Sequence, residues 1–276
     1  MSASAELPDL DSVVAADPAA IAQFAASGHT VVRGLASADE VAAYRPSLVA
    51  AAESRRFERR PLSERDTYGK AFLQMMNIWT VDEAARRFVC ARRFAKVAAD
   101  LLGVDGVRLY HDQALFKEPG GGPTPWHQDQ VYWPLDTPST ITMWMPIVDI
   151  PPEVGSMTFV AGSHRIGDVG AGQISDESNE AISQMISTRG LTLETHGALA
   201  AGDATFHAGW TLHSAGANPT GAMREVVTVI YYADGARVSE PTARQRFDLQ
   251  LWLTGLAPGD LAASDEHPVL YSRNGS

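Results

Sequence analysis

Cysteine, net positive charge and long apolar runs are scarce in this chain, and each scarcity excludes a class of protein. Cys90 is the single cysteine among 276 residues, so no intramolecular disulfide can form, and a reducing compartment is expected. Lys and Arg number 22 against 33 Asp and Glu, and the net charge of −11 argues against a nucleic-acid partner, since phosphates require basic patches. No segment of the sequence approaches the ~20 consecutive apolar residues that span a bilayer.

The first seven residues, MSASAEL, lack the basic start and the apolar core of a secretory signal. We therefore expect a cytoplasmic protein with a small-molecule substrate and with neither a membrane nor a nucleic acid as partner. Nothing in the sequence indicates an oligomeric state.

Length and composition suit one domain, which we expect to cover residues 1–276. The hydrophobic content of 45% is ordinary for a globular protein. Its N-terminal part, about 17–103, is expected to be largely helical. Asp17 and Pro18 begin a helix that Gly28 ends, and residues 29–33 form a short strand.

Two capping boxes are predicted further along this helical part. Ser37 and Glu40 form one, and Thr80 and Glu83 form another, which opens a helix that runs to Gly103.

The pattern changes at Val107, where short apolar runs broken by Gly and Pro begin. Examples are the runs 141–145, 157–160 and 226–232. This spacing predicts a mainly β core over about 107–235, and a double-stranded β-helix (a cupin-like jelly roll) backed by the N-terminal helices fits it best. Residues 165–200 interrupt the pattern with a polar stretch and a short helix at 180–187. They form either a lid over the site or a solvated surface insertion.

His127 and Asp129 are the most informative pair in the chain. In an extended backbone, residues two apart point to the same face, so both can bind one metal ion from one side. His213 is the best candidate for a third ligand, because the turn residues Gly216 and Asn218 follow it; His207 is its main rival. Two imidazoles and one carboxylate leave positions open for oxygen and a cosubstrate, as in non-haem Fe(II) oxygenases.

Arg224 adds a second signal, eleven residues after His213 and just before the strand-like run 226–232. On a strand neighbouring that of His213, its guanidinium could face the metal cavity, where its fork suits bidentate capture of a carboxylate.

Several separated segments together share the pattern of a known family: His127–Asp129, Gly162–His164, Gly202–Asp203 before Phe206, His213–Asn218 and Arg224. From about residue 20 to residue 271, the sequence resembles the phytanoyl-CoA dioxygenase (PhyH) family of Fe(II)/2-oxoglutarate-dependent oxygenases. Relatives often carry a hydroxyl two residues after the distal histidine, where this chain has Ala215.

The resemblance implies His127, Asp129 and His213 as iron ligands and Arg224 as the partner of the distal carboxylate of 2-oxoglutarate. It also implies cosubstrate contacts at Gln113 and Trp144. Fe(II), 2-oxoglutarate and O2 are the expected cofactor and cosubstrates, with no catalytic residue apart from the iron centre.

The expected reaction is hydroxylation of an unactivated C–H bond of a small metabolite, such as a natural-product intermediate, with release of succinate and CO2. The carboxylate ligand favours hydroxylation over halogenation. Desaturation, cyclisation and epimerisation remain open as outcomes. So do a cupin-like metalloenzyme that does not use 2-oxoglutarate, for instance one with zinc, and a jelly roll without catalysis. Three residues are candidates for lining the substrate pocket: Gln74, Asn77 and Trp133.

Overall fold

Two antiparallel sheets face each other in the computed structural model, which describes residues 6–154 and 156–275. The larger sheet has seven strands in the described residues, in the order β1-β8-β5-β10-β3-β11 with β2 paired to β3. Its strands are β1 (His29–Val32), β2 (Leu73–Met76), β3 (Gly106–Phe116), β5 (Thr140–Pro146), β8 (Ala204–Ala208), β10 (Val226–Ala233) and β11 (Val269–Ser272).

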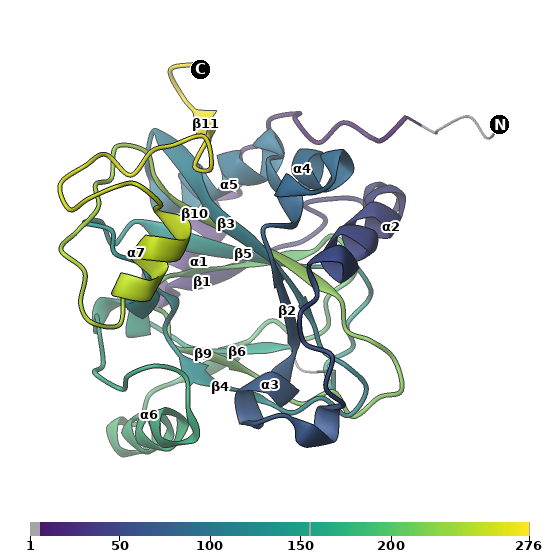
Figure 1. The fold of residues 1–276 in the computed structure, drawn as a ribbon, viewed down its shortest axis with the longest axis vertical. Helices are drawn as coiled ribbons and strands as arrows, with labels where there is room; N and C mark the ends of the chain where they lie inside the picture. The colour runs from purple at the N-terminus through teal and green to yellow at the C-terminus, as the bar shows by residue number, and fades with distance from the viewer. Residues whose placement is uncertain (1–5, 155, 276) are drawn as a thin grey trace.

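The smaller sheet has the order β4-β9-β6-β7. Its strands are β4 (Thr124–His127), β6 (Met157–Val160), β7 (Leu193–Thr195) and β9 (His213–Ala215). Figure 1 shows β9, β6 and β4 below the strands of the larger sheet. Because strands far apart in sequence alternate between the two sheets, the predicted jelly-roll fold is confirmed. Strands β1, β2 and β11 of the larger sheet lie outside the range 107–235 expected for its core.

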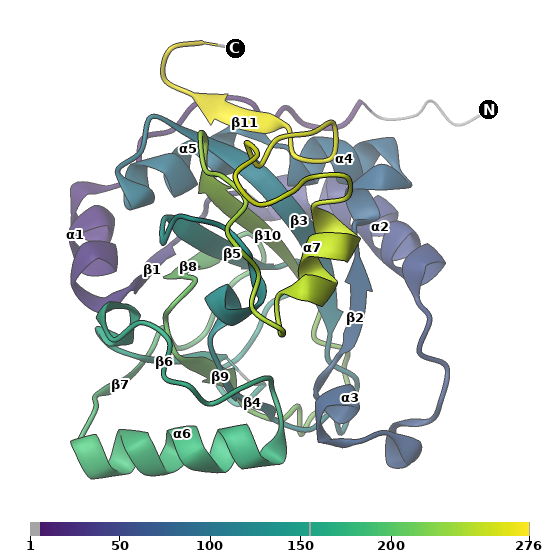
Figure 2. The ribbon, with the colours of Figure 1, turned by 60° about the vertical axis from the view of Figure 1, so that its left-hand side comes forward.

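Helices cover the outer face of the larger sheet and flank the smaller one. They are α1 (Pro18–Ser27), α2 (Ala38–Arg55), α3 (Thr67–Ala71), α4 (Glu83–Val89), α5 (Arg92–Leu102), α6 (Asp176–Arg189) and α7 (Arg246–Trp252). Short 3-10 turns are η1 (Leu62–Glu64), η2 (Ile78–Thr80), η3 (Asp129–Tyr132) and η4 (Ser163–Arg165). Figure 2 shows α6 beside the small sheet, at the opposite end of the molecule from β11. None of the helices in the described ranges is long and apolar enough to cross a bilayer.

The main hydrophobic core lies between the N-terminal helices and the larger sheet. Phe88 and Phe94 are fully buried there beside Tyr44 of α2, and Val227 and Val229 of β10 belong to the same cluster. Close packing of this apolar layer holds the larger sheet rigid. The side chains on the opposite face of the sheet are therefore held in fixed positions.

The observed helix N-caps agree with those predicted from the sequence for two helices and differ for a third. Asp17 caps α1, Gly28 ends it in the left-handed conformation, and Ser37 caps α2 in a capping box. The predicted helix from Thr80 to Gly103 is wrong. Asp82 caps α4 instead, and the chain leaves the helical conformation at Ala91 before α5 begins.

Thr80 cannot act as the predicted cap because its hydroxyl donates to the Asn77 carbonyl oxygen in the preceding turn. The Asp82 carboxylate accepts the Ala85 N–H at 2.8 Å and takes that role. The interruption between α4 and α5 lets the Arg93 N–H donate to the Leu10 carbonyl oxygen at 3.1 Å, which ties the N-terminal segment down.

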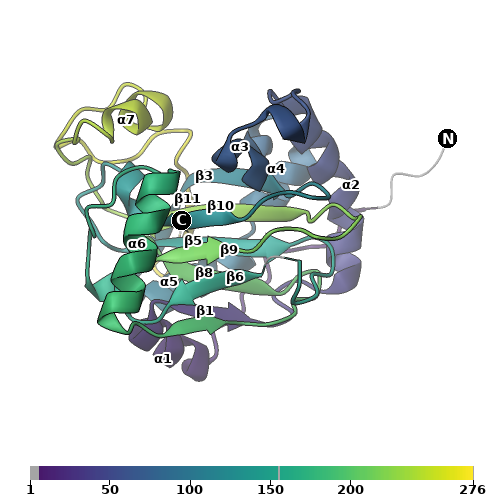
Figure 3. The ribbon, with the colours of Figure 1, turned by 90° about the horizontal axis from the view of Figure 1, so that it is seen from below.

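Residues 165–200 contain a longer helix than the sequence predicts. α6 spans Asp176–Arg189, and Ile182 and Ile186 bury its inner face against Leu212 and Val160. In Figure 3, α6 lies along one side of the small sheet. Asn179 accepts the Trp126 N–H at 2.9 Å, so the helix is bonded to β4 directly.

Candidate metal centre and its cavity

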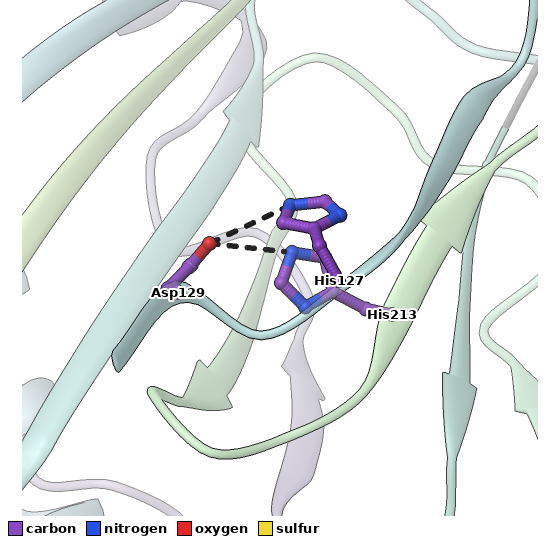
Figure 4. A group of neighbouring side chains, drawn as sticks. All are labelled: His127, Asp129 and His213. Atoms are coloured by element: carbon purple, nitrogen blue, oxygen red, sulfur yellow. Dashed lines mark ion pairs between the residues drawn. The ribbon is translucent and has the colours of Figure 1, made fainter. Parts of the chain in front are cut away.

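Three side chains from neighbouring segments converge at the edge of the small sheet. His127 ends β4 and lies opposite His213, the first residue of β9, so their rings approach to 4.1 Å between centroids. Asp129, which begins η3 rather than continuing the strand, returns to the same side. Its Oδ1 lies 3.5 Å from Nε2 of His127 and 3.6 Å from Nε2 of His213. The ligand atoms lie within 4.8 Å of one another, and Figure 4 shows the side chains pointing together.

Both imidazoles are held by their other nitrogen. Nδ1 of His127 donates to the Pro125 carbonyl oxygen at 2.8 Å, and Nδ1 of His213 donates to that of Thr211 at 2.9 Å. With the proton on Nδ1, the lone pair of each Nε2 faces the Asp129 carboxylate. Two neutral imidazoles and one carboxylate aimed at a common point fit a divalent transition metal.

The electrostatics of the cluster also favour the metal-binding protonation states. Burial opposes the charge of Asp129, but His213, His207 and His127 hold the pKa of its carboxyl well below the usual range. Burial, followed by the neighbouring His127, depresses the pKa of His213 strongly. Burial also lowers the pKa of His127. The cluster therefore presents an ionised carboxylate and neutral imidazoles at neutral pH.

The structure separates the two rival histidines. His207 lies on β8 in the larger sheet, and its Nε2 is 3.0 Å from Oδ2 of Asp129, the other carboxylate oxygen. Thr142 of β5 donates its hydroxyl to the same Oδ2 at 2.9 Å. His207 and Thr142 therefore orient the carboxylate, while its Oδ1 faces His127 and His213.

Arg224 is buried, with 2% of its surface exposed, and it precedes β10. Its backbone pairs with that of Lys117, and its guanidinium carbon lies 5.3 Å from the ring centroid of Trp144. Burial lowers the pKa of Arg224 to about 9, so the side chain remains a cation at neutral pH.

The predicted route of Arg224 to the site is wrong in one respect. β10 pairs with β3 and β5 in the larger sheet and not with β9, so the guanidinium approaches from the opposite sheet. The physical reason is the alternation of strands between sheets, which moves the chain across the sandwich between residues 215 and 226.

One cavity of about 460 Å³ contains all of these groups. His127, Asp129 and His213 line it together with the expected cosubstrate residues Gln113, Trp144 and Arg224. Two of the three predicted substrate residues, Gln74 and Trp133, line it as well.

Asn77 does not belong to the lining residues. Its backbone takes the left-handed conformation at φ 53°, and its N–H donates to the Asp112 carbonyl oxygen at 3.0 Å behind β3. Of the apolar run that contains Asn77, Met76 lines the cavity, and the chain turns away from it at Asn77.

The sequence pattern did not indicate several of the residues that line the cavity. Thr142 could have been found, because it alternates with Trp144 along β5 and so shares its face. A second group comes from the C-terminal segment, which carries no strand pattern: Arg244, Phe247, Asp248, Leu251 and Trp252. Gln173 and Ile174 contribute from the polar stretch before α6.

Comparison with known proteins agrees with this geometry. The family model described as phytanoyl-CoA dioxygenase (PhyH) matches residues 24–226. A curated relative, the "Probable alpha-ketoglutarate-dependent hypophosphite dioxygenase" of Stutzerimonas stutzeri, is 27% identical over 164 residues, which are 56% of this chain and 54% of the relative. The chain thus spans about half the length of the curated relative that it matches.

Solved structures match over almost the whole chain. The non-heme alpha-ketoglutarate-dependent carbocyclase SnoK from nogalamycin biosynthesis is 23% identical, with a TM-score of 0.75 over 96% of this chain and 99% of that chain. The epimerase SnoN, in complex with Fe3+, alpha-ketoglutarate and nogalamycin RO, is 28% identical, with a TM-score of 0.74 over 92% of this chain and 100% of that chain. Since the family model covers well over half of its residues, the chain belongs to the phytanoyl-CoA dioxygenase (PhyH) family of Fe(II)/2-oxoglutarate-dependent oxygenases.

Proposed function

We propose that this protein is an Fe(II)/2-oxoglutarate-dependent dioxygenase that hydroxylates an unactivated C–H bond of a small metabolite and releases succinate and CO2. The observation that carries the proposal is that one cavity contains a cluster of metal-ligand side chains and, on the opposite sheet, a buried cation. The His127–Asp129–His213 cluster is on one sheet, and the buried Arg224 cation approaches from the other.

Each element has a separate task. His127, Asp129 and His213 would hold the iron, and the guanidinium of Arg224 would bind the distal carboxylate of 2-oxoglutarate. Gln113 and Trp144 line the same cavity and would contact the cosubstrate. When bound, iron together with 2-oxoglutarate and O2 supplies the oxidising power for cleavage of the C–H bond.

The protein's own contribution is orientation and exclusion of water. Thr142 and His207 fix the Asp129 carboxylate, and the backbone acceptors of Pro125 and Thr211 fix the two imidazoles. The Arg224 guanidinium lies over the Trp144 ring, which helps to hold its fork in place. Burial of the cation strengthens its attraction for a carboxylate.

Cyclisation, epimerisation and desaturation are outcomes of the same centre with a different substrate pose. The likeness to SnoN and SnoK, an epimerase and a carbocyclase from nogalamycin biosynthesis, supports a natural-product intermediate as substrate. A zinc enzyme that does not use 2-oxoglutarate is disfavoured, because it has no use for a buried cation at Arg224. We also propose a cytoplasmic location and a single domain over 1–276; the single cysteine supports the first.

Succinate formation tests the proposal without knowledge of the primary substrate. Purified protein with Fe(II), ascorbate, O2 and 2-oxoglutarate is expected to release succinate slowly by uncoupled turnover, and omission of iron should abolish the signal. Protein loaded with zinc is the matched control. Equal succinate from the zinc-loaded and iron-loaded protein, or none from either, would reject the proposed function.

A further inference from the structure

A buried carboxylate lines the cavity at the end contributed by α7. Asp248 is only 9% exposed, and the residues described, 6–154 and 156–275, provide no hydrogen bond or ion pair for its side chain. Burial raises the pKa of this carboxyl to about 7. Its oxygens are not among the fully enclosed unpartnered atoms of the described residues, so they open into the cavity, where a donor group of a ligand can reach them. A carboxylate with so little water and no partner gains from such a donor, which points to a ligand group.

A second buried polar atom lies at the same cavity. His111 is 3% exposed, and its Nδ1 has no hydrogen-bond partner within the described part of the chain. The His111 ring lies 4.6 Å from that of Trp252, which is one helical turn after Asp248 on α7. Asp248 and His111 therefore belong to one region of the cavity wall.

The walls beside these polar groups are aromatic and aliphatic. Trp133 and Trp252 are buried, while Phe247 and Leu251 line the cavity yet are 66% and 44% exposed. Large apolar side chains left exposed at a cavity are typical of a surface that a ligand covers. Extended, flat apolar compounds match such walls.

The two ends of the cavity differ in charge. Arg224 provides a cation at the end where its backbone pairs with that of Lys117, whereas Asp248 provides an acceptor on α7, where Trp252 contacts His111. An anionic cosubstrate is therefore attracted to the first end. A primary substrate with a hydrogen-bond donor is attracted to the second, and an anionic substrate is repelled there.

We propose that Asp248 determines specificity for the primary substrate by accepting a hydrogen bond from a hydroxyl or ammonium group on a flat, largely apolar molecule that lies along α7. The inference rests on the proposed function, because it names the substrate class of the same cavity. Arg244 also lines this end. Its cation opposes a second positive charge on the ligand, so a single donor group and not a multiply charged amine is the expected partner.

The competing explanation is structural. Asp248 lies in the first turn of α7, where an acidic side chain can stabilise the N-terminal end of a helix. The two explanations predict opposite effects on stability. Removal of a carboxylate kept for binding leaves the melting temperature equal or higher, whereas removal of one kept for the helix lowers it.

Binding of simple probes tests the inference on the full chain, both with Fe(II) plus 2-oxoglutarate under anaerobic conditions and without them. The probes are naphthalenes with one aminomethyl, hydroxymethyl, methyl or carboxylate substituent, and binding is followed by fluorescence of the cavity tryptophans. Wild-type protein is expected to prefer the aminomethyl or hydroxymethyl probe over the methyl probe by about tenfold or more. Asp248→Leu should abolish this preference, and Asp248→Asn should reduce the preference for the amine. The exposed Asp265→Asn control should change nothing.

The outcomes separate the two proposals. An unchanged probe ranking in Asp248→Leu, tightest binding of the carboxylate probe, absence of any donor preference in wild type, or a melting temperature several degrees lower in both Asp248 variants would overturn the inference. Wild-type protein that makes no succinate but keeps the donor preference would overturn the proposed function and leave only the binding of a donor group by Asp248 supported.

Discussion

At the scale of single residues, the tautomers of His127 and His213 determine what the cluster can bind. Their Nδ1 atoms are bonded to backbone oxygens, so only Nε2 is free to face Asp129. The sequence predicted His127 and Asp129 from their spacing in an extended segment, although Asp129 begins a 3-10 turn and reaches the cluster from there. It predicted His213 from the turn residues that follow it. Thr142 and Asp248 were not predicted. Their roles depend on neighbours that are far away in sequence, and no local pattern encodes those contacts.

Removal of the third ligand should have a different effect from removal of its rival. We expect His213→Ala to lose iron binding almost completely. His207→Ala should still bind iron, with affinity weakened about 10–100-fold, because it loses only an interaction that orients Asp129. Iron content after equilibrium dialysis measures both. Equal iron loss in the two variants, or greater loss in His207→Ala, would contradict the assignment.

The Arg224 cation should matter for the cosubstrate and not for the metal. Arg224→Ala is expected to raise the KM for 2-oxoglutarate by about 100-fold or more, since a bidentate charged hydrogen bond in a buried site is lost. Iron content should stay near that of wild type. Arg224→Lys is the matched control, and it should recover only part of the loss because an ammonium lacks the planar fork. Parallel loss of iron and of 2-oxoglutarate binding in Arg224→Ala would count against the role.

At the scale of elements, the site depends on the connection that carries the chain from β8 in one sheet to β9 in the other. The strand runs were predicted because their apolar residues are continuous. The partner of β10 and the break between α4 and α5 were not predicted, since both are decided by contacts with distant segments. The lid hypothesis for residues 165–200 now concerns a narrower part. α6 is packed on β4, whereas Gln173 and Ile174 reach the cavity.

Gly202, at the turn before β8, should be intolerant of any side chain. Its backbone is left-handed at φ 91°, and an added Cβ would fall on the Ala36 carbonyl oxygen. Gly235 has a similar φ of 93° but open space around it, so it provides the matched control. We expect Gly235→Ala to cost about 1–3 kcal/mol from backbone strain alone. Gly202→Ala should cost about 1–3 kcal/mol more. Urea unfolding measures the loss of unfolding free energy in both variants. Equal losses would show that the backbone shifts to relieve the overlap of the added Cβ with the Ala36 carbonyl oxygen.

Ligand-dependent protection tests the narrowed lid hypothesis. Limited proteolysis should cut the segment 167–174 less readily when Fe(II), 2-oxoglutarate and a bound probe are present, because Gln173 and Ile174 line the occupied cavity. Cleavage within α6 should not change under the same conditions. Unchanged cleavage at 167–174 would favour a plain surface insertion.

At the scale of the whole molecule, buried histidines should make the metal-free protein sensitive to acid. Burial lowers the pKa of His29 and of His111 to about 3 and that of His267 to about 4. Below pH ~6.5 these histidines bind protons in the unfolded chain but stay neutral in the folded chain. The free energy of unfolding therefore falls with pH until the lowered pKa values of the folded state are reached. Burial raises the pKa of Asp112 and of Asp248 to about 7, and these two groups act in the opposite direction.

The histidines outnumber the two carboxyls, since the pKa is also lowered at His127, His164, His196 and His213. Chemical denaturation at pH 7 and pH 5 should therefore show that the free energy of unfolding falls by more than about 1.4 kcal/mol per pH unit. Constant or increasing stability over that range would mean that the histidines are not buried in the neutral form.

The jelly roll itself was predictable because its strands are short, apolar and punctuated by turn residues. The C-terminal segment that carries α7 was not, although it supplies a wall of the cavity. That helix is only seven residues long, and Trp252 packs it into a small cluster with Tyr110 and Trp133, so its sequence carries little periodic signal.

The most direct test of the account is a crystal structure of the protein soaked anaerobically with Fe(II) and 2-oxoglutarate, with the iron located by anomalous scattering. We expect one iron bound by His127, Asp129 and His213, with the distal carboxylate of 2-oxoglutarate on Arg224. Iron bound through His207, iron at another place in the cavity, or a cosubstrate carboxylate that avoids Arg224 would contradict it.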